Sequence, residues 1–177
     1  VQVKNFVTGE QDWIALAGPA NKQARIAADN ICGIDQSYQG TQGSFIMKMF
    51  NQTIACTGVN ETQAKTLGLD YDKAYLWSDN HPSYFPGNEK MNIKVLFEKK
   101  TGKLLGTQIV GGEGVDKRCD VLATAIRAGM TGTDLTELEL CYAPPYSSPK
   151  DPVNMIGYVI ENVLTGKLKQ VFWDEVD

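Results

Sequence analysis

Apolar residues recur along the chain at two spacings, which separate the expected helices from the expected strands. In residues 115–129 they fall every three or four positions and predict a helix with one buried face, formed by Val115, Cys119, Leu122, Ala125 and Ile126. In residues 91–111 two apolar runs flank the polar turn 100–103, which predicts a β-hairpin. Residues 43–59 alternate as a second strand pair with Asn51-Gln52 as its turn, and 72–80 predict one more strand.

The ends of the two long flanking helices are marked by proline, glycine and a capping side chain. Residues 16–33 predict a helix with Pro19 in its first position and Gly33 at its end. The last long helix is expected to run from a cap at Asp151 to Gly166. Its apolar side chains cover more than half of its circumference, which predicts burial on two sides, against the sheet and against a second surface: Val153, Met155, Ile156, Val159, Ile160, Val163 and Leu164.

Two short helical segments, at 61–68 and 133–139, complete the order helix, strands, helix, strands, helix, helix. That order predicts an α+β fold, a mostly antiparallel sheet covered by helices on one face. The 177 residues are enough for one domain, or for one domain with a long appendage.

The charge and the cysteine content of the chain limit the partners and ligands that it is expected to bind. The net charge of −4 and the scattered Lys and Arg residues argue against a nucleic-acid surface, and no apolar run approaches the ~20 residues of a membrane span. With one histidine and four widely separated cysteines, no metal site is expected. The apolar neighbours of the cysteines predict buried free thiols in a reducing, cytoplasmic compartment.

Three segments carry candidate chemistry that has a simpler explanation. The glycines of residues 108–117 follow a strand and precede a helix, but they match no dinucleotide or phosphate-loop pattern, so a tight turn is favoured. His81 is interpreted as a loop histidine with ordinary hydrogen bonds rather than a general base. The helix start at Gly18 and Pro19 offers unpaired amides to a negatively charged group, as helix starts generally do.

The loop at residues 141–154, CYAPPYSSPKDPVN, holds Tyr142 and Tyr146 around a proline pair. The rings either seal the loop onto a helix, or their hydroxyls act on a ligand. Residue types by themselves favour the first reading.

Three segments together resemble one family. Residues 14–33 (IALAGPANKQARIAADNICG), 81–87 (HPSYFPG) and 142–166 (YAPPYSSPKDPVNMIGYVIENVLTG) resemble the C-terminal third of pyridine nucleotide-disulfide oxidoreductases, in the branch of coenzyme A-disulfide reductase and NADH oxidase. The resemblance covers almost the whole chain. Ala24 departs from it, since the family usually has glycine there.

The resemblance implies a domain plan and a longer parent protein. Residues 1–35 correspond to the C-terminal tail of an FAD-binding domain, and residues 40–166 to a dimerisation domain. Residues 167–177 correspond to a linker that in some members leads to a rhodanese domain. The polar start at Val1 fits this plan, and the chain by itself is expected to be inactive.

The resemblance also implies cofactors and a site. FAD and NAD(P)H would be bound mainly by regions outside this chain, with Leu16, Ala17, Gly18 and Pro19 as the residues here that contact cofactor. The protein would be a homodimer in which Tyr84 and Tyr142 reach the partner's active cysteine and serve reduction of coenzyme A disulfide. Tyr146 keeps the sealing role. The alternatives are an NADH oxidase acting on oxygen or peroxide, and a free-standing dimerisation module without redox chemistry.

Overall fold

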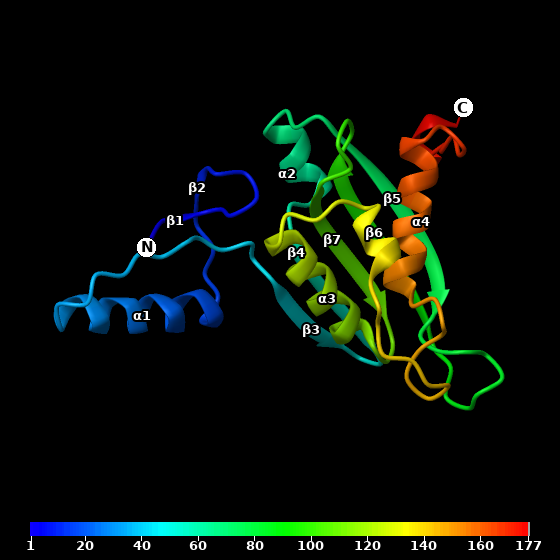
Figure 1. Cartoon of the computed structure of the whole chain (residues 1–177), viewed down its shortest axis with the longest axis horizontal. Helices are drawn as coiled ribbons and strands as arrows, with labels where there is room; N and C mark the ends of the chain where they lie inside the picture. The colour runs from blue at the N-terminus through cyan, green and yellow to red at the C-terminus, as the bar shows by residue number, and fades with distance from the viewer. Residues whose placement is uncertain (177) are drawn as a thin grey trace.

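A computed structural model describes residues 1–176 and confirms an α+β fold built on an antiparallel sheet (Figure 1). Within the described residues the main sheet has five strands in the order β3-β4-β7-β6-β5. Their bounds are β3 Phe45–Met49, β4 Gln52–Gly58, β5 Tyr71–Asp79, β6 Lys90–Glu98 and β7 Leu104–Gly111. The predicted hairpin is β6-β7, and Gly102 turns it with a φ of 74° that glycine adopts without strain.

Two helices cover one face of this sheet (Figure 1). α3 (Val115–Arg127) packs on β4 and β7, while α4 (Pro152–Leu164) packs on β5 and on the short η1 (Asp134–Glu137). The core lies between sheet and helices, and the five apolar positions expected on one face of α3 are all buried there.

The two faces of the sheet differ in polarity and exposure because neighbouring side chains alternate. Ala55, Ile109 and Ile93 are paired across three strands, and all three are fully buried under the helices. On the other face Met47 and Trp77 remain exposed. α2 (Glu61–Thr66) covers one end of that face through a small cluster of Val59, Ala64 and Leu96, and the side chain of Asn60 caps it.

Two predicted boundaries are wrong by one or two residues. Met49 pairs with Gln52, so the β3-β4 turn is Phe50-Asn51 rather than Asn51-Gln52. α1 (Ala17–Ile31) begins two residues before Pro19, because the N–H of Ala20 bonds to the carbonyl of Leu16. Proline is tolerated in the third position because N–H groups of the first turn have no intrahelical acceptor.

The wide apolar stripe of α4 is partly covered within the chain. Of its seven residues, Val153, Ile156 and Ile160 are buried, whereas Met155, Val159, Val163 and Leu164 are only partly buried. Gly157 lets η1 approach, since a Cβ there would lie 2.8 Å from Leu135 Cβ. β5 and η1 therefore cover part of the stripe, and its burial against a second surface stays a prediction.

The N-terminal segment stands beside the sheet rather than on it (Figure 1). It contains the short strand pair β1 (Val3–Lys4) and β2 (Gln11–Asp12), followed by α1. Within residues 1–176, no α1 residue is buried, so the helix lacks a packing partner there. The last residue of the expected linker 167–177, Asp177, lies outside the described residues.

Candidate functional site: paired tyrosine loops and the start of α1

The structure brings Tyr84 and Tyr142 together from loops far apart in sequence. Tyr84 lies in the loop between β5 and β6, and Tyr142 in the loop between η1 and α4. Both loops leave the same end of the molecule, where α4 begins (Figure 1). The two phenols lie close enough for Tyr84 to raise the pKa of Tyr142, although 58 residues of sequence separate them (142 − 84).

The environment of the pair keeps a phenol protonated. The neighbouring Tyr84 hydroxyl raises the pKa of Tyr142, and a smaller contribution comes from desolvation. Tyr84 is 75% exposed and Tyr142 46% exposed, so both hydroxyls are open to a ligand from outside the chain. An exposed neutral phenol can donate a hydrogen bond at neutral pH without carrying charge.

The loop of Tyr84 is closed by bonds at its base. The N–H of Asn80 donates to the carbonyl of Glu89, and the N–H of Glu89 donates to the side-chain oxygen of Asn80. Asn88 donates to the carbonyl of His81. His81 is buried, bonds through Nδ1 to the carbonyl of Pro82 and meets Phe85 edge to face. The interpretation of His81 as a loop histidine with ordinary hydrogen bonds is confirmed.

The loop of Tyr142 is a tight turn, and its second tyrosine, Tyr146, does not seal the loop as expected. The N–H groups of Tyr146 and Ser147 both donate to the carbonyl of Ala143. The side chain of Tyr146 is 71% exposed, so the prediction that this ring seals the loop is wrong for this chain. The loop is held by its backbone and by Ser147, which is fully buried.

The glycines before α3 allow close approach of side chains. Gly114 has a φ of 82°, and a Cβ there would collide with the guanidinium of Arg118. A Cβ on Gly112 would collide with the Glu89 carboxylate, which already accepts the N–H of Glu113. These contacts support a tight turn, because a carboxylate occupies the place where a phosphate would need free amides.

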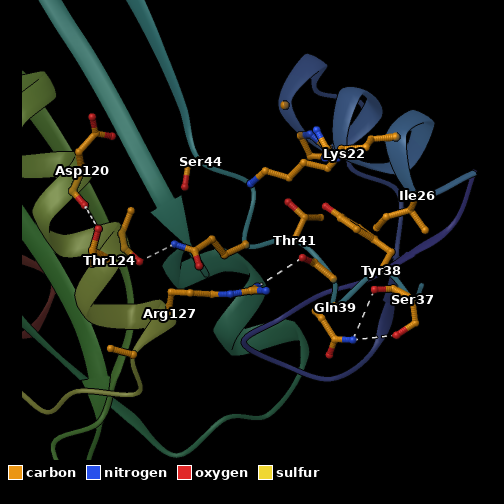
Figure 2. A pocket seen from close by; sticks show the side chains of 17 residues that line it. Lys22, Ile26, Ser37, Tyr38, Gln39, Thr41, Ser44, Asp120, Thr124 and Arg127 are labelled. Carbon is orange, nitrogen blue, oxygen red and sulfur yellow. Dashed lines mark hydrogen bonds between the residues drawn. The ribbon is translucent and has the colours of Figure 1, made fainter. Parts of the chain in front are cut away.

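The start of α1 borders a second candidate site, an open cleft of about 1010 Å³ between α1 and α3. Gly18 and Pro19 line it, whereas Leu16 and Ala17 precede them without lining it. Figure 2 shows Lys22 reaching in from α1, while Asp120 and Arg127 lie on the α3 side.

The start of α1 fits an electron-rich group. Leu16 is extended, and within the described residues no side chain caps the helix. Pro19 has no N–H, so Ala17 and Gly18 supply the first free amides, and a Cβ built on Gly18 meets no atom within 4 Å. These residues suit the carbonyl edge of a flavin, but they form only one margin of a cofactor site.

The thiols only partly match expectation. All four cysteines are free, but only Cys119 is buried; Cys56 is half-buried, and Cys32 and Cys141 are exposed. Among the described residues no cluster of three or more His, Cys, Asp or Glu could hold a metal ion. None of the helices in residues 1–176 is long and apolar enough to cross a membrane.

Sequence reasoning missed a buried polar cluster beside the tyrosine loops, formed by Arg118, Asp151 and Ser147. Asp151 was recognised only as a helix cap, a role that the structure confirms. A signal was available: Arg118 lies three residues after Val115 and four before Leu122, inside the apolar stripe of α3.

Comparison with known proteins identifies the protein family of this chain. The family model described as "Pyridine nucleotide-disulphide oxidoreductase, dimerisation domain" matches residues 45–152. The chain belongs to this family, and its sheet with helices on one face is the family's dimerisation fold.

The relatives that share 39–47% identity with this chain are named as reductases. The coenzyme A disulfide reductases of Staphylococcus epidermidis and Staphylococcus aureus are each 40% identical over 146 residues, 82% of this chain. The chain spans about a third of their length, 33%. The reduced CoADR-RHD of Bacillus anthracis superposes with a TM-score of 0.96 at 47% identity, covering 99% of this chain and 32% of that one. An NAD-dependent persulfide reductase from A. fulgidus gives 0.95 at 39% identity, with coverage of 99% and 32%.

Proposed function

We propose that this chain is the dimerisation part of a flavin-dependent, NAD(P)H-driven reductase that acts as a homodimer. Its substrate would be coenzyme A disulfide, or a related disulfide or persulfide of coenzyme A. One observation carries the proposal: two loop tyrosines lie near each other, exposed, on a domain whose relatives at 39–47% identity are reductases of this kind.

The tyrosines would serve the departing thiolate. Bound FAD would supply electrons taken from NAD(P)H to the substrate disulfide. The raised pKa of Tyr142 keeps its phenol protonated at neutral pH, so it can donate to the coenzyme A sulfur as negative charge develops there. Pro144 and Pro145 restrict the loop, which supports a hydroxyl positioned in advance.

The site of action is proposed to be in the partner subunit. Both tyrosines are exposed on their own domain, and a second copy of the protein is proposed to bring a reactive cysteine to them. On the cofactor side, Leu16, Ala17, Gly18 and Pro19 would present the start of α1 to the flavin carbonyl edge, and the remainder of the FAD and NAD(P)H sites would lie in the missing two-thirds.

The test uses the full-length protein with Tyr84→Phe and Tyr142→Phe, and Tyr146→Phe as matched control. Each of the first two removes one hydroxyl while keeping the ring, and turnover of coenzyme A disulfide should fall by up to ~10²-fold. The rate at which NADH reduces the flavin should not change, because that step precedes attack on the disulfide. Tyr146→Phe should behave as wild type.

Wild-type turnover in both Phe variants would contradict the role of the pair. A second check uses mixed dimers: a Tyr142→Phe subunit combined with a subunit lacking the active cysteine should regain one working site. Absence of complementation would place the tyrosines in their own subunit's site.

Two alternatives predict different products. An NADH oxidase should consume oxygen or peroxide with NADH and should not respond to Tyr142→Phe; the Lactobacillus brevis water-forming NADH oxidase shares the fold at 22% identity. A dimerisation module without redox chemistry should contain no flavin in the full-length protein. Stoichiometric flavin absorbance with turnover of coenzyme A disulfide or persulfide excludes both.

A further inference from the structure

Arg118 is a fully buried cation next to the tyrosine loops. It lies in the first turns of α3 and is 1% exposed, between side chains that face the core. A buried guanidinium is tolerated only where its charge is paired and its N–H groups are bonded. The groups that bond to Arg118 therefore show which segments of the chain it holds together.

The guanidinium contacts oxygens from four separate segments. Nη2 lies 2.8 Å from the carbonyl oxygen of Asn80, 2.9 Å from Asp151 Oδ2, 3.2 Å from Ser147 Oγ and 3.4 Å from the carbonyl oxygen of Tyr146. Nε donates to Asp151 Oδ1 at 3.3 Å, and Nη1 to the carbonyl of Gly114 at 3.3 Å.

These contacts join the bases of the two tyrosine loops. Asn80 opens the loop of Tyr84, four residues before it, and Tyr146 lies four residues after Tyr142. Asp151 completes the bridge as the cap of α4: it accepts the N–H of Val153 at 2.9 Å and the hydroxyl of Ser147 at 2.6 Å.

The tyrosines need such a bridge because they are not packed. With exposures of 75% and 46%, their rings take little orientation from the core. The Asn80–Glu89 bonds shape one loop, and Lys117 contacts only the other, through the carbonyl of Cys141 and, at 3.7 Å, the carboxylate of Asp151 at its end. Among residues 1–176, Arg118 is the side chain outside the two loops that bonds to both.

We propose that Arg118, paired with Asp151, is a positioning residue that fixes the separation of the two tyrosine loops and so sets the placement of Tyr84 beside Tyr142. This inference rests on the proposed function for the role of the pair in catalysis, but the geometry it describes can be measured without turnover. Arginine is needed because its planar fork reaches both loops and the carboxylate, whereas lysine presents one ammonium.

The experiment compares Arg118→Lys in the full-length holoenzyme with Glu61→Gln, which breaks a partly buried ion cluster on α2. In Arg118→Lys, disulfide turnover should fall, on the order of 10²-fold if the hydroxyls move by about 1 Å. Flavin reduction by NADH should be unchanged. In the Tyr84→Phe/Tyr142→Phe background the same Arg118 substitution should cost less than about twofold, because coupled residues are not additive. Glu61→Gln should lower stability and keep wild-type turnover.

A second readout is fluorine NMR of fluorotyrosine-labelled protein, with the Tyr142 signal assigned by its loss in Tyr142→Phe. Arg118→Lys should shift that signal and lower the pH at which Tyr142 titrates. Ser147→Ala, a milder change if Arg118→Lys does not fold, should shift it in the same direction. An unmoved signal in a folded Arg118→Lys or Ser147→Ala variant overturns the inference. If the signal moves but both Phe variants keep wild-type turnover, the positioning role stands and the proposed function fails.

Discussion

At the residue scale, the cysteines differ in reactivity because their surroundings differ. Burial raises the pKa of Cys119 to about 12, with Asp120 adding to the effect, and raises that of Cys56 to about 11. Since the thiolate is the reactive form, a thiol reagent at pH 8 should label Cys32 and Cys141 rapidly and the other two slowly. Peptide mass spectrometry over time measures this, and rapid labelling of Cys119 in the folded chain would contradict it.

Glu61 is the residue whose ionisation should contribute most visibly to acid stability. Burial alone would raise its pKa, but hydrogen bonds from Lys94, Lys73 and Lys65 outweigh burial and hold the pKa well below the ordinary value. A carboxylate with a lowered folded pKa stabilises the protein above its unfolded value, about 4.3, and that stabilisation is lost as pH falls below it.

Glu61→Gln should therefore lower the free energy of unfolding at pH 7 by about 1–3 kcal/mol and flatten its decline below about pH 5. Urea titrations at several pH values measure both effects. Glu139→Gln, at an exposed position, serves as the control and should leave the curve unchanged. Equal curves for wild type and Glu61→Gln would show that the cluster contributes nothing.

At the element scale, the packing of α4 on η1 reverses the usual effect of a glycine in a helix. Replacing a helical glycine by alanine normally stabilises by up to about 1 kcal/mol. At Gly157 the new Cβ would lie 2.8 Å from Leu135 Cβ and 2.9 Å from the carbonyl oxygen of Gly132, and neither atom is at the end of a flexible side chain.

Gly157→Ala should therefore destabilise the chain by about 1–3 kcal/mol, as overpacking does. Chemical denaturation gives the value. Gly18→Ala is the matched comparison, since its Cβ meets nothing within 4 Å, and it should be neutral or mildly stabilising. A stabilised Gly157→Ala protein would mean that η1 is free to move away.

At the scale of the whole molecule, stability should be uneven. α1 has no buried residue within residues 1–176, whereas β6 and β7 form the centre of the sheet and carry much of the core. Amide hydrogen exchange in this chain should be fast in α1 and slowest in β6 and β7.

In the full-length protein α1 should gain protection, since residues 1–35 are proposed to complete an FAD-binding domain. Mass spectrometry of the two forms side by side measures the difference. Slow exchange of α1 in the isolated chain would contradict the proposed boundary near residues 35–40.

The sequence by itself determined the elements and their class. Period-two and helical spacings, the caps Asn60 and Asp151, and the turn glycines are local signals, and each predicted element forms within a residue or two of its expected bounds. The family followed from three long motifs, and it is the family that the chain belongs to. Tyr84 and Tyr142 were named from that resemblance, because residue types favoured packing.

Only the tertiary structure decided what those residues meet. The Tyr84–Tyr142 neighbours and the Arg118–Asp151 pair are 58 and 33 positions apart in sequence, and no local spacing encodes such contacts. Exposure was also decided by the tertiary structure. Tyrosine and cysteine are residue types that are often buried, but Tyr146, Cys32 and Cys141 are exposed, because burial depends on which surfaces the assembled sheet and helices cover. Signals between neighbouring residues determined each helix and strand, and packing between residues far apart in sequence determined the site.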